Sequence, residues 1–182
     1  MSLLRFIGLD GSHGRAGVQG DTETVRRIAA TLDALPPDRA RYLAAFAYVL
    51  ARVAVADLRI DEAETAKMQD IVAAHGQLPE GAAALVVEIA KSQARLLGGT
   101  ENYVVTREFM KISTRQQRAD LLRCLFAIGA ADGTISGAES AEIVAIAEEI
   151  GFTRAECNGL RAQHRDQLSE LQGLPGRSGL PE

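Results

Sequence analysis

Apolar residues recur along most of this chain at the three- and four-residue spacing of an α-helix. Residues at that spacing share one face of a helix, so each run predicts an amphipathic helix. The predicted helices run over residues 21–35, 38–56, 62–74, 80–97, 114–128, 137–150 and 154–171. Residues 100–113 favour a further short helix, although Tyr103, Val104 and Val105 leave a strand open. The pattern predicts an all-α fold of about seven helices.

The chain aligns with itself without a gap at a shift of 75 positions, with core positions on core positions. The matched pairs include Leu50 with Leu125, Val53 with Ile128, Asp57 with Asp132, Ile60 with Ile135, Glu64 with Glu139, Met68 with Ile143 and Gly76 with Gly151. The alignment predicts two helix-loop-helix repeats, each with a Gly that ends a helix. Because one repeat cannot bury its apolar stripe alone, we expect the two to pack about a pseudo-twofold axis as one bundle.

The two ends of the chain differ in composition from its middle. Residues 1–20 combine a short apolar stretch with a Gly at every third position, which predicts a flexible N-terminal segment. Residues 173–182 hold three Gly and two Pro and are expected to form a disordered tail. The helical domain is therefore predicted to cover residues 21–172.

Composition and charge exclude several classes of protein. The net charge of −4 and the scattered Arg residues provide no cationic face for nucleic acid. No apolar run approaches the roughly 20 residues of a transmembrane helix, and Asp10 ends the first apolar run too early for a signal peptide. We therefore expect a cytoplasmic protein, with weak peripheral membrane contact open through residues 1–9. Cys124 and Cys157 match neither a disulfide framework nor a CxxC metal motif, and Cys124 is expected to be buried.

Two acidic segments follow matching helices, and we call residues 57–64 the first acidic loop and residues 132–139 the second acidic loop. In each, an N-cap residue precedes a Glu by three positions, as Asp61 precedes Glu64 and Ser136 precedes Glu139. That spacing is typical of a capping box, which satisfies the free amides at a helix start. The same spacing recurs at two other predicted helix starts, Thr114 with Gln117 and Thr153 with Glu156. The recurrence favours a structural role for the acidic residues.

The alternative is a site for a divalent cation, the one cofactor that the sequence suggests. Its candidate ligands are the four aligned carboxylates, Asp57, Glu64, Asp132 and Glu139. Hard cations such as Ca²⁺ or Mg²⁺ prefer such oxygen ligands. A standard EF-hand is excluded, because its first and third ligand positions would fall on Ile128 and Ala130.

The second acidic loop and the helix before it resemble a known family. Residues 125–135 read Leu-Phe-Ala-Ile-Gly-Ala-Ala-Asp-Gly-Thr-Ile and are followed by Glu139, which is similar to the signature of the TerB-like, tellurite-resistance-associated domain. Residues 53–60 with Glu64 form a second, similar copy, in which Leu58 replaces the Gly and Arg59 adds a positive charge. The resemblance covers about residues 22–171. It implies an all-helical fold, an association with tellurite and other chemical stress, and either metal binding through the four carboxylates or a role as an interaction module.

The function expected from these observations is non-catalytic. The chain contains no nucleophile-elbow sequence, and its spacing identifies no Ser-His-Asp or Cys-His catalytic arrangement. We expect a TerB-like stress-response or interaction module that binds a protein partner. The alternative function is a divalent-metal-binding protein that uses the paired acidic loops.

Overall fold

The computed structural model describes residues 19–54, 62–94 and 102–169. The eight α-helices in these ranges are α2 (Gln19–Asp33), α3 (Pro37–Ala54), α4 (Glu62–Gly76), α5 (Glu80–Ala94), α6 (Asn102–Ile112), α7 (Arg115–Gly129), α8 (Gly137–Glu149) and α9 (Arg154–Arg161). A 3₁₀-helix, η2 (Ala162–Gln167), continues from α9. The predicted all-α fold is confirmed. Among the described helices, none has the length and apolar character needed to cross a membrane.

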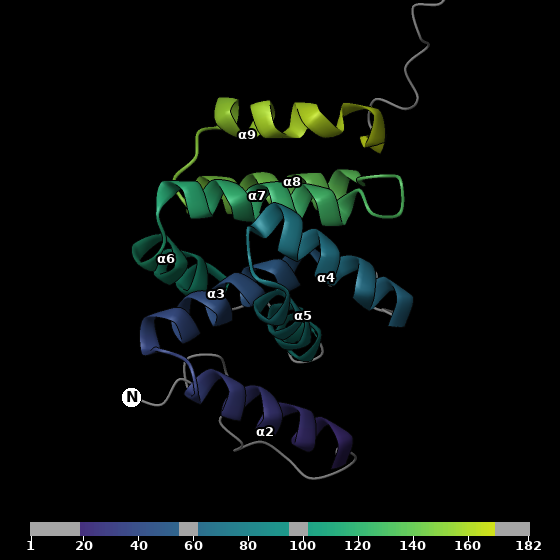
Figure 1. The fold of residues 1–182 in the computed structure, drawn as a ribbon. Helices are drawn as coiled ribbons and strands as arrows, with labels where there is room; N and C mark the ends of the chain where they lie inside the picture. The colour runs from purple at the N-terminus through teal and green to yellow at the C-terminus, as the bar shows by residue number, and fades with distance from the viewer. Residues whose placement is uncertain (1–18, 55–61, 95–101, 170–182) are drawn as a thin grey trace, which may run out of the picture.

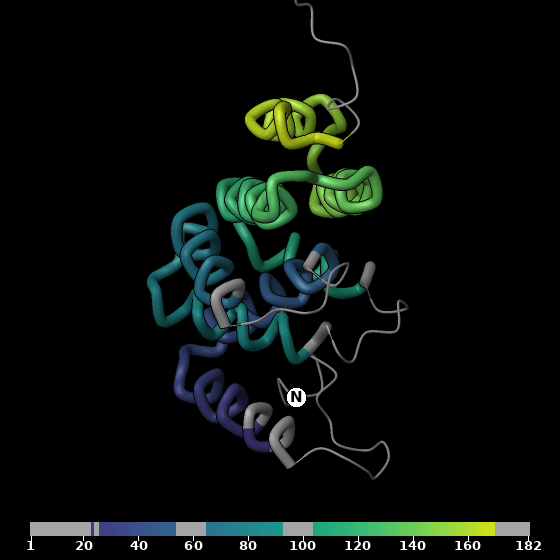
Figure 2. The backbone as a smooth tube through the Cα atoms, turned by 90° about the vertical axis from the view of Figure 1, so that its right-hand side faces the viewer, coloured from purple at the N-terminus to yellow at the C-terminus, as the bar shows by residue number. Residues whose placement is uncertain are grey.

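The helices stack in layers, as Figures 1 and 2 show from two directions. α9 and η2 form one outer layer, and α7 and α8 lie side by side beneath them. The helices from α3 to α6 form the middle of the molecule, and α2 packs on its far side against α5 and α3. The second acidic loop connects α7 to α8, so it lies next to the outer layer.

α3 is the central helix of the bundle. Its residues 42–51 are all buried, and α3 contacts α2, α5, α6, α7 and α8. The sequence pattern predicted one buried face, whereas the structure buries this helix on all sides, as expected for a helix that is apolar all round. Four Ala residues in that stretch leave space for the neighbouring helices to approach. Rings from α3 and α6 fill the larger space, with the centroid of Tyr42 5.7 Å from that of Phe109.

The helices of the two predicted repeats pack crosswise. α4 packs on α7 and α3 packs on α8, so the second helix of each unit contacts the first helix of the other. At the shift of 75 positions, the end of α3 falls on the end of α7 and the start of α4 falls on the start of α8. These boundaries and contacts are what a pseudo-twofold arrangement would give. The equivalence of the two repeats stays a prediction.

Three local expectations are settled by the described residues. Residues 102–112 form the helix α6, so the strand left open by Tyr103, Val104 and Val105 does not form. The last predicted helix, residues 154–171, is shorter than expected: α9 ends at Arg161, and η2 contains a kink at His164, where φ is −114° and ψ is 23°. Gly76 was predicted to end a helix, and α4 does end at Gly76, while the next residue, Gln77, has the positive φ of 53°.

Candidate functional site at the second acidic loop

The second acidic loop is fixed at its C-terminal end by a capping box. The Glu139 amide donates to Ser136 Oγ at 3.2 Å, and the Ser136 amide donates to Glu139 Oε2 at 2.8 Å. The other two predicted boxes, Thr114 with Gln117 and Thr153 with Glu156, are also formed. The structural interpretation of Glu139 is therefore confirmed: its carboxylate satisfies an amide at the start of α8. The corresponding Asp61 lies outside the described residues.

Asp132 begins the loop, and its side chain turns back on the backbone. The Thr134 amide donates to Asp132 Oδ1 at 3.1 Å, which gives the turn that Asx residues commonly stabilise. Gly133 between them has a φ of 98°, a value that glycine adopts without strain. Asp132 itself is exposed to solvent. The loop thus presents one carboxylate at a fixed position on the surface.

Ile135 anchors the middle of the loop to the bundle. Its side chain is 1% exposed and lies over the end of α7, where a Cβ on Gly129 would be 3.7 Å from it. Ile135 therefore fixes the loop to the core. Ile60, its partner in the alignment, lies outside the described residues.

A segment from the far end of the domain completes the loop. We call residues 162–169 the C-terminal strap. The Ile135 amide donates to the Gln167 carbonyl at 2.6 Å, and the Ser169 amide donates to the Ile135 carbonyl at 3.0 Å. These two bonds form a parallel β-bridge between Ile135 and Leu168, and the Leu168 side chain is buried. The kink at His164 lies between the end of α9 and the residues that pair with Ile135.

A basic side chain from α4 reaches the same place. Lys67 Nζ donates to the carbonyl oxygen of Ala131, the residue before Asp132. This contact joins α4 to the start of the second acidic loop. A divalent cation near Asp132 would be repelled by this ammonium group.

A partly buried ion-pair network lies where α3 meets α8, away from the loop carboxylates. The Arg52 side chain, 5% exposed, pairs with Glu142 at 2.8 Å and with Glu149 at 2.7 Å. Burial raises the pKa of the Glu149 carboxyl, but hydrogen bonds from Arg52 and Thr106 outweigh it and hold the pKa below its usual value. The guanidinium therefore stabilises two carboxylates between the two halves of the bundle.

The structure brings two of the four predicted metal ligands onto one loop. Asp132 and Glu139 both belong to the second acidic loop, and each carboxylate accepts a hydrogen bond from a backbone amide of the loop. Asp57 lies outside the described residues, and so does the side chain of Glu64. Among the described residues, no three His, Cys, Asp or Glu side chains are grouped as a metal site would require.

Sequence reasoning missed Lys67, Arg52 and the C-terminal strap. The ion pairs of Arg52 join residues 90 and 97 positions apart, so no local spacing could indicate them. Leu168 was assigned to a regular helix, because apolar spacing continues past Arg161. The backbone at His164 is non-helical, and the His164 ring stacks on Phe126 with the centroids 6.0 Å apart, a contact between residues far apart in the chain that local spacing could not indicate.

Comparison with known proteins agrees with this architecture. No curated protein and no solved structure is significantly similar to the chain. A family model described as tellurite resistance protein TerB matches residues 42–162, which is more than half of the chain. The matched region begins inside α3 and ends just after α9, so it contains both acidic loops and most of the bundle. The chain therefore belongs to the TerB family.

Proposed function

We propose that this TerB-family chain is a non-catalytic stress-response module that binds a protein partner at the second acidic loop. Family membership supports the stress-response class. The observation that carries the binding role is the fixed, exposed position of the Asp132 carboxylate, which the Asx turn, the Ile135 anchor and the capping box hold in place. A surface that is already ordered loses little conformational entropy when a partner binds.

The charge of this surface indicates the kind of partner. Asp132 is exposed at the loop, and a Lys or Arg side chain of a partner would pair with it. Such a pair at the edge of an interface contributes more to specificity and association rate than to affinity. We therefore expect a partner with a basic residue at its contact surface.

The test is affinity capture from a native lysate with the wild-type chain and two charge-reversal variants. Asp132→Arg changes the proposed surface, and Glu23→Arg changes an equally acidic, exposed position on α2 at the opposite side of the molecule. A partner bound through the loop should be enriched by the wild type and by Glu23→Arg, and lost with Asp132→Arg. Capture that is the same with all three proteins would contradict the proposed surface.

The second candidate function is divalent-cation binding through Asp57, Glu64, Asp132 and Glu139. The observation that favours it is that the capping bond of Glu139 uses only one of its two carboxylate oxygens, so the other is available in principle for a ligand bond. Lys67 at the Ala131 carbonyl acts against it. We rank it below partner binding for that reason.

Calorimetric titration of the metal-stripped protein with Ca²⁺, Mg²⁺, Zn²⁺ and Mn²⁺ tests the cation site. Glu139→Gln removes the charge and keeps the capping box, since Gln117 forms the same box at α7. Glu156→Gln makes the identical change in the box of α9 and is the matched control. Binding that is lost in Glu139→Gln and retained in Glu156→Gln would support the site. The absence of heat at millimolar cation would exclude it.

A further inference from the structure

The C-terminal strap contacts the second acidic loop through a parallel β-bridge between Leu168 and Ile135. It is the one β-bridge in the described part of this helical chain. Its two hydrogen bonds use the amide and the carbonyl of Ile135, and the strap contributes only backbone groups of Gln167 and Ser169 to them. Backbone groups are common to every sequence, so these bonds alone do not require this particular segment. What the strap adds is one apolar side chain, Leu168, which is 4% exposed.

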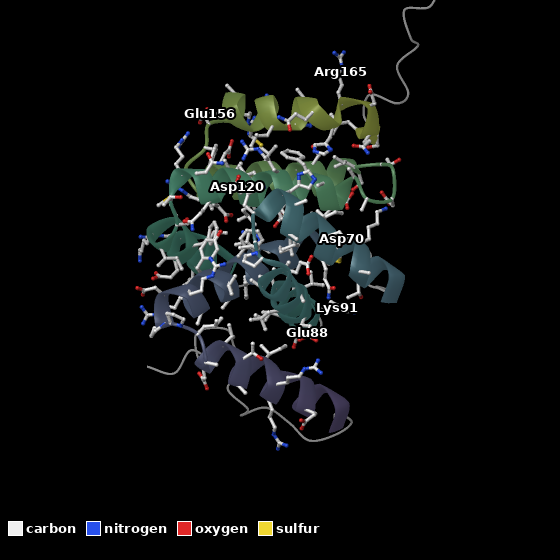
Figure 3. All side chains as sticks on the ribbon, in the orientation of Figure 1. Asp70, Glu88, Lys91, Asp120, Glu156 and Arg165 are labelled. Atoms are coloured by element: carbon white, nitrogen blue, oxygen red, sulfur yellow. The ribbon has the colours of Figure 1, made fainter. Side chains whose placement is uncertain are left out.

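Two polar side chains of the strap pair with each other, since His164 Nδ1 lies 3.0 Å from Gln167 Oε1. Arg165 is exposed, and Figure 3 shows its side chain pointing away from the bundle. Asp166 and Ser169 are exposed as well. The contacts that join the strap to the rest of the bundle include the two backbone bonds, the buried Leu168 and the ring of His164 stacked on Phe126.

The strap also departs from the helix that the sequence pattern favours. The matching stretch in the first repeat belongs to α5, which is helical through Ala94, whereas the second repeat leaves the helix at Arg161. At Leu168 the backbone is extended, with φ −75° and ψ 117°. A peptide that binds by β-augmentation has the same features. It is extended, it pairs through its backbone, and it buries apolar side chains.

We propose that Ile135 and the buried position that Leu168 fills form a peptide-binding position, which the C-terminal strap occupies in cis. The partner that fits it is an extended peptide segment with a Leu-like residue in the place of Leu168, paired in parallel with Ile135. The strap competes with such a peptide at the high effective concentration of a tethered ligand, which is in the millimolar range. Partner binding then releases the strap from the outer layer. This inference does not require Asp132 or Glu139 to bind anything.

The experiment uses full-length variants that weaken the strap and a synthetic peptide of residues 163–171 with blocked ends. Ser169→Pro removes the amide that donates to the Ile135 carbonyl, and the extended backbone of Leu168 is already compatible with a following Pro. Ser169→Ala keeps that amide and is the matched control. Leu168→Asp is a second, stronger variant, which removes the apolar anchor. Binding is followed by the NMR signals of the Thr134, Ile135 and Ser136 amides.

The peptide should bind Ser169→Pro at least about tenfold more tightly than it binds the wild type or Ser169→Ala, because the cis competitor is weakened. A peptide with Asp in the place of Leu168 should not bind. Equal affinity for the wild type and the Pro variant would overturn the proposal. So would the absence of binding to both strap variants while circular dichroism shows their helix content to be native. If Leu168→Asp does not fold, the comparison of Ser169→Pro with Ser169→Ala decides.

Discussion

Gly76 and Gly151 align in the sequence, but the structure uses them differently. Gly151 follows α8 with a φ of 87°, and the Phe152 amide donates to the Ala147 carbonyl at 2.8 Å, which is a Schellman motif. Gly76 instead ends α4 as a helical residue, where a Cβ would be 3.1 Å from the Phe46 ring. Its role is close packing, and the left-handed position passes to Gln77.

Gln77→Gly should raise the free energy of unfolding by about 0.5–1 kcal/mol, because Gly adopts a positive φ without the strain of a side chain. The loss of the bond from Gln77 Nε2 to the Ala74 carbonyl reduces this gain. Urea denaturation measures this gain. Destabilisation by Gln77→Gly would show that the side-chain bond outweighs the strain.

Gly151→Ala should lower the free energy of unfolding by about 1 kcal/mol. Gly81→Ala, at a helical position where an added Cβ would have nothing within 4 Å, should raise it.

Glu156 is predicted to titrate far below an ordinary Glu. Hydrogen bonds from the Thr153 amide and hydroxyl, together with Arg115, lower the pKa of its carboxyl to about 2. Because the folded-state pKa is lowered, the stabilisation is complete above the ordinary value of 4.5 and is lost as pH falls toward about 2. An NMR titration of the Glu156 carboxyl measures the midpoint. Thr153→Ala removes the hydroxyl bond but keeps the amide bond, which is the larger cause, so it should move the midpoint only part of the way toward 4.5; a midpoint that does not respond would remove the hydroxyl as a cause.

At the scale of elements, the contact between α3 and α8 depends on Arg52. Glu142 and Glu149 lie about two helical turns apart on α8, and one guanidinium reaches both. Burial alone would disfavour each charge, so the pairing matters more for the uniqueness of this packing than for its gross stability. The network joins α3 to α8 through one partly buried guanidinium.

Arg52→Ala should lower the free energy of unfolding by about 2–3 kcal/mol, because it leaves two partly buried carboxylates without their cation. The pKa of Glu149 should rise toward its usual value, since Arg52 is a cause of its lowering. The wild-type contribution is present above that usual value and is lost as pH falls below it. Lys111→Ala, which removes an exposed partner of Glu108, is the control and should cost less than about 1 kcal/mol. Equal effects of the two variants would refute the role of Arg52.

At the scale of the whole molecule, the layers differ in how firmly they are held. α3 is surrounded by five other helices, whereas α9 contacts only α7, α8 and η2 among the larger described contacts. Elements with few packed neighbours open at lower free energy than the core. We therefore expect the outer layer of α9 and the C-terminal strap to open before the bundle unfolds.

The two cysteines report on this order of opening. Cys124 in α7 and Cys157 in α9 are both fully buried, and burial raises the pKa of each thiol, so neither reacts readily in the closed state. Alkylation under native conditions, followed by mass spectrometry, should label Cys157 faster than Cys124. The rate for Cys124 should follow global unfolding measured by circular dichroism. Equal rates for the two thiols would mean that the molecule opens as one unit.

Helix positions and caps could be predicted from the sequence because they depend on neighbours within a few residues. Thr114, Ser136 and Thr153 begin helices through bonds to residues three positions on, and all three boxes are formed. The burial of Ile135 followed from its place in the apolar pattern. For the candidate site, the pattern identified Asp132 and Glu139 but not Lys67, whose contact with Ala131 spans 64 positions.

The sequence by itself determined the helical class, the TerB resemblance and the local structure of the second acidic loop, since these arise from periodic burial and short-range hydrogen bonding. Only the tertiary structure decided that Gln77 rather than Gly76 takes the left-handed turn, that Arg52 joins α3 to α8, and that the C-terminal strap pairs with Ile135. Each of these depends on which distant surfaces meet, and local spacing contains no information about those contacts.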